Sequence, residues 1–308
     1  MFVVCGEALM DVYMGEPTAT GLALDARIGG SPLNVAQGLA RLERPVAFLT
    51  GLSTDASGER LLASLRAEGV DTSLVLRSDA PSTLSVVSVD AAGVPRYAFH
   101  GKDAADRQIT HENLPALPSA ARVLQLGSYA LAVEPVGSAL RALAARECVQ
   151  RLVAYDLNVR LNVEPDLAHW REVVAFMAPI AHLMKTSDED LALLYPDETP
   201  EQVAARWLAL GAALVVVTRG RDGATAWTRE RRIDTPSPAV TVVDTVGAGD
   251  TFQAALLAWL DEQDALTPEA LAGLGAEALG QALGFAARAA ALTCSRRGAD
   301  LPRRAELR

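Results

Sequence analysis

Short, continuous runs of apolar and β-branched residues recur along the first two thirds of the chain, and helical patterns lie between them. An apolar run without alternation is typical of a strand buried on both faces, as in a parallel sheet covered by helices. The predicted strands are Phe2–Cys5, Val46–Thr50, Val123–Leu126, Leu152–Tyr155, Leu183–Lys185 and Leu214–Thr218. The predicted helices are Leu33–Leu42, Glu59–Glu68, Pro135–Glu147, Ala168–Ala178 and Pro200–Leu210, followed by Thr251–Trp259 and Pro268–Thr293. This order predicts an α/β fold, a doubly wound and mostly parallel sheet with helices on both faces.

Two stretches interrupt this alternation and predict a second, smaller β-sheet. Asp11–Ile28 contains glycine and proline and has no helical period. Leu84–Phe99 alternates as a strand does, with a turn predicted at Asp90–Gly93. We therefore predict a single domain over residues 1–308, with a small β-sheet lid formed by approximately residues 11–30 and 84–108. The lid segments could also pair two copies of the chain in a homodimer.

The composition excludes several classes of protein. The chain has 308 residues, of which 50% are hydrophobic, and no apolar run reaches the roughly 20 residues that span a bilayer. Its first residues show no basic region of a signal peptide. The three cysteines stand far apart among apolar residues, as buried thiols of a reducing compartment do. We expect a cytoplasmic protein without a membrane partner.

Charge and histidine spacing narrow the choice of ligands. The net charge of −10 argues against nucleic acid as a partner. The four histidines form neither an HxH nor an HExxH pair, so a histidine-based metal centre is not expected. A small anionic ligand remains compatible with this charge because a few local donors suffice to hold it.

The most informative motif is VDTVGAGDTF at residues 243–252, predicted to connect a strand at 239–243 to a helix. Glycine lacks a Cβ, so such a backbone turns tightly and comes close to a ligand. Amides at the start of a helix, aided by its dipole, suit a phosphoryl group. The amides of this predicted nest belong to Gly247, Ala248, Gly249 and Asp250.

Asp250 stands beside this nest as the candidate catalytic base. Its carboxylate could accept the proton of an attacking hydroxyl, for which positioning matters more than basicity. Taken alone, the short GAGD sequence would equally suit a helix cap after a glycine turn. The motif is neither GxxxxGK[ST] nor GxGxxG, so it is neither a Walker P-loop nor a dinucleotide fingerprint.

At this point the chain resembles the ribokinase-like carbohydrate kinases, also called the phosphofructokinase-B family. The segment DTVGAGD at 244–250 is similar to the second signature of that family. Further similar segments are GEALMD at 6–11, GGSPLNVA at 29–36, DLNVR at 156–160, YAF at 97–99 and AADR at 104–107, and the last three resemble the fructokinase branch. The resemblance covers essentially the whole chain.

The resemblance implies a sugar site whose residues also have a physical interpretation. Asp11 ends the first strand, at the sheet edge where open α/β folds bind ligands, although alone it would indicate a turn. Asn34 could donate to and accept from a polyol, or cap a helix. Phe99 could pack on a sugar face or within the lid. The implied sugar-binding residues are Asp11, Gly30, Asn34, Phe99, Arg107, Asn158 and Arg160.

The resemblance also implies binding of ATP, Mg²⁺ and a monovalent cation. The ATP-binding residues would be Lys185, Ser187, Thr218, Gly220 and Gly223. Either Glu189 or Asp190 would serve Mg²⁺ through water, because this stretch departs from the usual family pattern. Asp244, with the loop at 294–299, could hold K⁺.

These features predict an ATP-dependent sugar kinase, foremost one that converts fructose to fructose 6-phosphate. Another small sugar or a sugar acid such as 2-dehydro-3-deoxygluconate remains open, because Arg107 or Arg160 could pair with a carboxylate. A nucleoside kinase is less favoured, since the lid shows no aromatic pair for a base. The doubly wound pattern alone would allow an oxidoreductase, but GEALMD replaces the expected GxGxxG. A catalytically silent sugar-binding protein would tolerate loss of the base or the glycines, and both are present.

Overall fold

The central layer of the computed structural model, which describes residues 1–89 and 95–307, is a nine-stranded sheet. Its strand order is β13-β12-β11-β10-β9-β8-β1-β4-β5. Strands β5 to β11 in this order are parallel, and β12 and β13 continue the sheet in antiparallel pairings. The strands are β1 (Phe2–Cys5), β4 (Val46–Ser53), β5 (Val75–Ser78), β8 (Val123–Gly127), β9 (Leu152–Asp156), β10 (Leu183–Ser187), β11 (Leu214–Thr218), β12 (Ala224–Trp227) and β13 (Arg232–Thr235).

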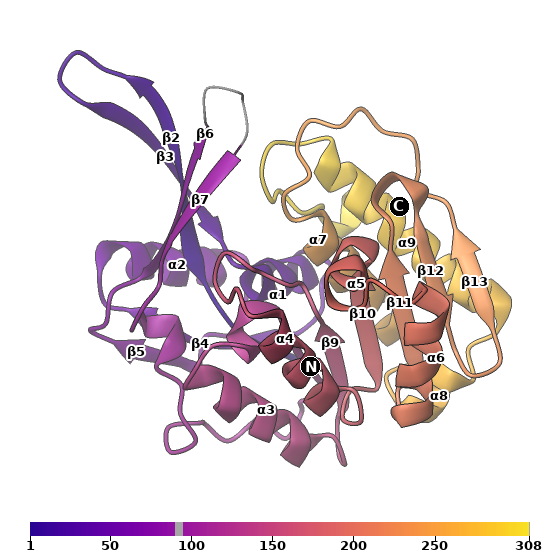
Figure 1. Ribbon diagram of the computed structural model, residues 1–308. Coiled ribbons are helices and arrows are strands. Elements are labelled where there is room, and N and C mark those ends of the chain that lie inside the picture. The colour runs from indigo at the N-terminus through magenta and orange to yellow at the C-terminus, as the bar shows by residue number, and fades with distance from the viewer. Residues whose placement is uncertain (90–94, 308) are drawn as a thin grey trace.

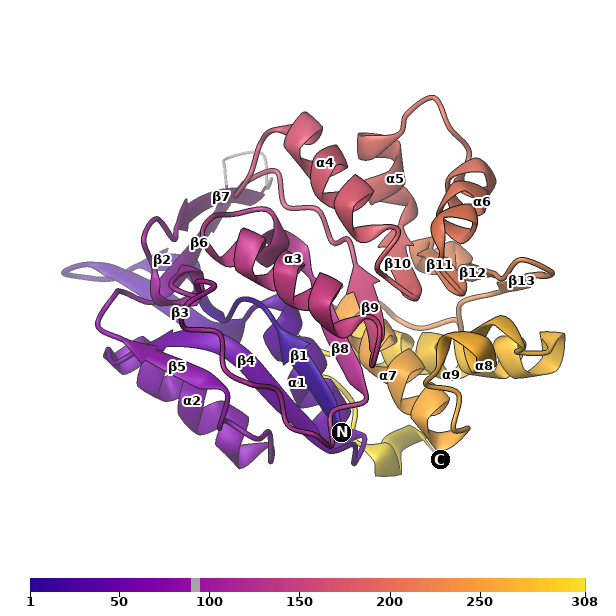
Figure 2. The same ribbon diagram turned by 90° about the horizontal axis from the view of Figure 1, so that it is seen from below.

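Helices cover both faces of this sheet, as Figure 2 shows. One face carries α1 (Ser31–Arg41), α2 (Ala56–Ala67), α7 (Ala248–Glu262), α8 (Pro268–Ala272) and α9 (Ala276–Cys294). The other carries α3 (Val136–Glu147), α4 (Leu167–Met177), α5 (Asp188–Leu194) and α6 (Pro200–Leu210). Short 3-10 helices occur at η1 (Ala105–Arg107), η2 (Ser128–Leu131), η3 (Gly220–Asp222) and η4 (Arg304–Leu307).

The core is divided by the sheet into two buried clusters. Leu39 of α1 and Leu256 of α7 lie in the cluster on one side, and Trp170 and Trp207 lie in the cluster on the other. The predicted strands that form this sheet are buried from end to end, except for the last residue of β10 and of β11, as continuous apolar runs require. The predicted doubly wound α/β fold is therefore confirmed.

A smaller sheet with the strand order β3-β2-β6-β7 projects from the main body (Figure 1). It consists of β2 (Leu9–Pro17), β3 (Leu22–Gly29), β6 (Thr83–Val89) and β7 (Pro95–His100). Strand β2 pairs in parallel with β6, and β3 and β7 add antiparallel edges. Both predicted segments thus form one sheet; the turn predicted at Asp90–Gly93 lies outside the described residues.

Three secondary-structure predictions were wrong. Asp11 does not end the first strand, because β1 ends at Cys5 and Asp11 lies in β2 of the small sheet. The strand predicted at 239–243 is irregular and exposed, because the loop has no neighbouring strand with which to pair. The helix predicted over Pro268–Thr293 is two helices, α8 and α9, separated at Gly273 and Gly275, which cap them. Among the described residues, no helix combines the length and apolar character needed to cross a membrane.

Candidate active site

The start of α7 places the glycine motif at the centre of the site. Gly247 has a φ of 78°, and a Cβ there would lie 2.6 Å from Cβ of Ala299, so this turn requires glycine. Gly249 and Asp250 are among the first residues of α7, where amides have no acceptor within the helix. Ala248 differs from the predicted nest, because its N–H donates to the carbonyl of Thr245 at 3.2 Å.

Asp250 is held by two side chains of α1. Ser31 Oγ donates to Oδ1 of Asp250 at 2.6 Å, and Asn34 Nδ2 donates to Oδ2 at 2.8 Å. The Asp250 residue is only 8% exposed, so both oxygens are fixed in a nearly dry setting. Sequence reasoning missed Ser31, although it lies within the GGSPLNVA segment. It also treated Asn34 only as a sugar ligand or a cap, whereas Asn34 binds the candidate base.

A polar cavity of about 550 Å³ opens in front of Asp250. It gathers most of the predicted sugar residues from β2, β7, α1 and the loop after β9. These are Asp11, Gly30, Asn34, Phe99, Asn158 and Arg160, and they are joined by Glu7, Ser128 and Tyr129. Arg107 is not among the described residues that line it. The Cζ atom of its guanidinium lies 5.7 Å from the ring centroids of Phe99 and of Tyr129, two residues of the cavity wall.

The predicted sugar ligands carry polar groups directed at this space. Burial raises the pKa of Asp11, and the Ser85 hydroxyl and the Arg160 guanidinium oppose that rise. Gly29 makes room for Asp11, because a Cβ there would lie 2.2 Å from Oδ2 of the carboxylate. Asn158 has a φ of 44°, and its buried Nδ2 has no hydrogen-bond partner among the described residues.

Glu7 is a residue of this cavity that sequence reasoning did not select. It is 1% exposed, and its Oε2 has no hydrogen-bond partner within the described part of the chain. Burial raises the pKa of Glu7 to about 8, while the Ser128 hydroxyl favours the charged form. The signal was present in the sequence, since Glu7 follows β1 directly, at the edge of the central sheet, and interrupts an apolar stretch.

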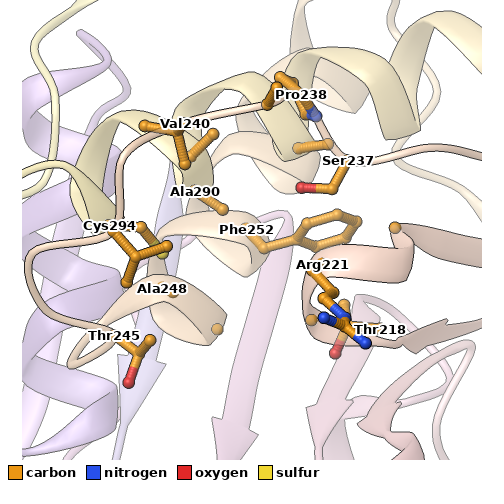
Figure 3. Close-up of a pocket in the computed structure, with 17 residues that line it drawn as sticks. Thr218, Arg221, Ser237, Pro238, Val240, Thr245, Ala248, Phe252, Ala290 and Cys294 are labelled. Atoms are coloured by element: carbon orange, nitrogen blue, oxygen red, sulfur yellow. The ribbon is translucent and has the colours of Figure 1, made fainter.

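A second cavity, of about 680 Å³ and mostly apolar, lies on the other side of the α7 terminus. Figure 3 shows Phe252, Val240 and Ala290 gathered about its middle, with Thr218 to one side. The predicted nucleotide residues Thr218, Gly220 and Gly223 all line it. An apolar slot with polar groups at its end suits the base and the phosphates of a nucleotide. Both cavities are lined by Thr245 and Gly249, so they meet at the glycine turn.

Lys185 lies beneath this meeting point rather than along the apolar cavity. Its Nζ donates to Oδ2 of Asp156 at 2.7 Å, and both side chains are buried. A Cβ on Gly249 would lie 3.8 Å from the same Nζ, so the ammonium group sits close to the glycine turn. Burial raises the pKa of Asp156 to about 6, and the charge of Lys185 opposes that rise.

The predicted metal residues differ in their exposure. Asp190 is buried and accepts a hydrogen bond from the Val159 amide at 3.2 Å, whereas Glu189 is exposed. Ser187 caps α5, its hydroxyl accepting from the Asp190 amide at 3.0 Å. Within the described ranges no cluster of three or more acidic, histidine or cysteine side chains could by itself hold a metal ion.

Asp244 ties two loops together near the apolar cavity. Its Oδ1 accepts from the Val246 amide at 3.1 Å, and its Oδ2 accepts from the Gly298 amide at 2.8 Å. The amides of Val243 and Asp244 also donate to the Cys294 carbonyl. These contacts bring Asp244 to the C-terminal loop with which the sequence associated it.

Comparison with known proteins identifies similar molecules over the full length. The chain matches the pfkB family of carbohydrate kinases over residues 1–305. It is 38% identical to a fructokinase of Rhizobium leguminosarum bv. trifolii, over 91% of this chain and 85% of that protein. The crystal structure of fructokinase with bound ATP from Xylella fastidiosa superposes with a TM-score of 0.89 at 26% identity, covering 99% and 96% of the two chains. A Vibrio cholerae O395 fructokinase double mutant, bound to fructose, ADP and potassium ion, gives a TM-score of 0.83 at 26% identity and the same coverage.

Proposed function

Because the chain belongs to the pfkB family of carbohydrate kinases, we propose that it transfers the γ-phosphoryl group of MgATP to the 6-hydroxyl of fructose. The observation that carries this proposal is the meeting of two unlike cavities at Thr245 and Gly249. The polar cavity suits a sugar and the apolar one suits a nucleotide base. Phosphoryl transfer between their ligands would take place at the glycine turn, beside Asp250.

Asp250 is the proposed catalytic base. As the sugar oxygen bonds to the γ-phosphorus, its proton passes to the Asp250 carboxylate, and the bond between that phosphorus and the leaving ADP oxygen breaks. Ser31 and Asn34 hold both carboxylate oxygens and so orient the base. In a loose transition state this orientation contributes more than basicity does.

The first turn of α7 is proposed to stabilise the moving phosphoryl group. The amides of Gly249 and Asp250 have no acceptor within the helix, and the helix dipole adds positive character there. The buried Lys185 ammonium lies close to Gly249 and supplies a full positive charge nearby. Preorganised donors of this kind stabilise charge as it develops on the equatorial oxygens.

We propose that ions assist through the acidic residues already described. When bound, Mg²⁺ neutralises charge on the nucleotide phosphates and is typically held by one or two carboxylates and by water. The isolated carboxylates of Asp190 and Glu189 fit that mode better than a complete protein cage. Asp190 is favoured of the two, because it is buried next to the segment that carries Asn158. A potassium ion is proposed at the Asp244 loop.

The choice of fructose rests on similarity and on the cavity. Relatives and solved structures that resemble the chain are named fructokinases, and one of them holds fructose. The cavity offers Asp11 and Asn158 as hydroxyl partners, and Phe99 as an apolar face. Arg160 also lines it and could pair with the carboxylate of a sugar acid, so 2-dehydro-3-deoxygluconate is the competing substrate to test.

A coupled assay of ADP release over a panel of sugars, sugar acids and nucleosides tests the proposal. Fructose should give the highest kcat/KM, and phosphorus NMR of the product should place the phosphate on the 6-oxygen. A higher kcat/KM for 2-dehydro-3-deoxygluconate would move the proposal to sugar acids. Absence of ADP release with every compound would refute it.

We propose further that the chain is a single domain whose small sheet acts as a lid and as a dimer surface. Met14, Leu22 and Leu24 on β2 and β3 expose large apolar side chains, and Leu24 is 61% exposed. Such residues on an outward sheet favour pairing with a second copy. Light scattering after size exclusion should give twice the chain mass, falling to the single mass in Leu24→Lys.

A further inference from the structure

We propose that Glu7 binds the sugar, forming a hydrogen bond through Oε2 to an oxygen other than that of the hydroxyl that is phosphorylated. Glu7 would thereby select substrates that carry a hydroxyl at that position. The inference deepens the proposed function and rests on it, because it concerns the same polar cavity. It assigns a specificity role to a residue that is separate from the base and from its supports.

The burial of Glu7 without a full set of partners is the first observation. The residue is 1% exposed, lines the polar cavity, and leaves Oε2 unpaired among the described residues. A buried polar atom without a partner costs free energy, and nearly all such atoms in native proteins are paired. A buried polar group left without a full set of partners in the wall of an open cavity is therefore expected to find its partner in the ligand.

A second residue of the same cavity wall also has an unpaired polar atom. Nδ2 of Asn158 is buried without a partner in the described ranges, and the backbone of this residue has a left-handed φ of 44°. Both oxygens of Asp250, in contrast, are already bound by Ser31 and Asn34. The polar atoms that still lack partners therefore belong to Glu7 and Asn158, in the segments that follow β1 and β9, and not to the candidate base.

The surroundings of Glu7 favour its neutral, protonated form. Three groups of other elements act on it besides burial: Asp106 of η1, Ser128 of η2 and Arg160 after β9. Asp106 disfavours the charged form of Glu7, whereas Arg160 and Ser128 favour it. Burial outweighs the effect of Arg160 and Ser128 and raises the pKa of Glu7 to about 8. Tyr129 also faces this group, and its hydroxyl donates to Asp106 at 3.0 Å.

A neutral carboxyl group suits a sugar hydroxyl better than a carboxylate does. It presents one O–H donor together with acceptor oxygens, whereas a carboxylate only accepts. A hydroxyl is likewise both donor and acceptor, so the pair can be matched in either direction. A site of this kind rejects an analogue that lacks the hydroxyl, because its own polar groups are then left unpaired.

The pH dependence of the sugar KM tests the inference. Wild-type KM for fructose should be flat near pH 7 and rise by up to about tenfold per pH unit above pH 8, as Glu7 loses its proton. Glu7→Gln keeps a donor and an acceptor but cannot ionise, so its KM should stay flat up to pH 9.5.

Deoxy analogues of fructose supply the second measurement. One of them should lose about 100-fold or more in kcat/KM with the wild type, and Glu7→Ala should lose most of that discrimination at this position alone. Glu147→Gln is the matched control, because Glu147 is a buried glutamate of α3 that pairs with Arg151 away from the cavity. It should keep the wild-type pH profile and the wild-type discrimination.

The outcomes separate this inference from the proposed function. A KM of Glu7→Gln that rises with pH as in the wild type would overturn the role of Glu7, as would unchanged discrimination in a folded Glu7→Ala. Thermal melting shows whether each variant is folded, and Glu7→Gln alone decides if Glu7→Ala does not fold. Failure of the wild type to release ADP with any sugar would refute the proposed function, and calorimetric titration with fructose would still report on Glu7.

Discussion

The side-chain amide of Asn34 donates a hydrogen bond of 2.8 Å to Oδ2 of Asp250. It joins the first turn of α1 to the first turn of α7, across 216 positions of sequence. Ser31, one turn earlier on α1, holds the other oxygen at 2.6 Å. The candidate base is therefore oriented by a helix whose own start is set by Gly30, where a Cβ would lie 2.7 Å from the Glu7 carbonyl.

Replacing the base should abolish turnover while leaving the nucleotide bound. Asp250→Ala removes the group that accepts the proton, so kcat should fall by about 1,000-fold or more. ATP affinity, measured by calorimetry, should change little, because the apolar cavity is not lined by Asp250. Asp264→Ala, at an exposed aspartate, is the control. Near-normal kcat in Asp250→Ala would remove this residue from the mechanism.

Loss of one support should affect kcat more than KM. Ser31→Ala leaves Oδ1 of Asp250 without its donor and frees the carboxylate to rotate, so kcat should fall by about tenfold. Steady-state kinetics with fructose measures the effect. Ser64→Ala offers a matched control, since the Ser64 hydroxyl accepts a hydrogen bond from Gln37 farther along α1. Equal activity of the two variants would contradict the positioning role.

Substitutions at the two glycines of the turn should affect different properties, stability at Gly247 and phosphoryl transfer at Gly249. Gly247→Ala forces a Cβ to 2.6 Å from Ala299 at a φ of 78°, so it should lower stability by about 1–3 kcal/mol. Gly249→Val meets no described atom closer than Lys185 Nζ at 3.8 Å from the added Cβ. It should melt near the wild-type temperature yet lose phosphoryl transfer, because the side chain fills the junction of the cavities. A melting temperature lowered equally in both would argue against this distinction.

Replacing only one residue of the buried ion pair of Lys185 and Asp156 should strongly lower the stability of the fold. Lys185→Met leaves the Asp156 carboxyl buried without its cation, which typically costs about 3–5 kcal/mol. Urea unfolding at pH 7 measures the loss. The double variant Lys185→Met/Asp156→Leu should recover much of that stability, because both charges are gone. Additive losses in the double variant would show that the two residues act independently.

Glu7 should make stability fall as pH rises. The folded protein holds the Glu7 proton up to a pKa of about 8, against about 4.5 for an ordinary glutamate, so between these values only the folded state carries it. Stability should therefore decline by up to about 1.4 kcal/mol per pH unit across that window and level off above it. Glu7→Gln cannot ionise, so its free energy of unfolding in urea should increase relative to that of the wild type from pH 5 to pH 8. Parallel pH profiles would contradict a proton held by Glu7.

Local pattern was enough to identify the central sheet. Phe2–Cys5 and Leu214–Thr218 have the predicted bounds, because apolar runs of this kind are stable only when both faces are covered. The strand predicted at 239–243 had a similar composition but lacks a neighbour, and it forms an exposed loop. The short strands β12 and β13 were not predicted, since they rely on pairing with β11 rather than on apolar content.

The sequence by itself determined the alternation of strands and helices, the glycine turn before α7, and the identity of Asp250 as a carboxylate beside it. Only the tertiary structure decided what each polar side chain faces. It brought Ser31 to Asp250 across 219 positions, placed the Arg107 guanidinium against the Phe99 ring, and left Oε2 of Glu7 without a partner among the described residues. Period and composition report whether a residue is buried, but hydrogen bonds between distant segments depend on how the helices pack, and no local pattern encodes them.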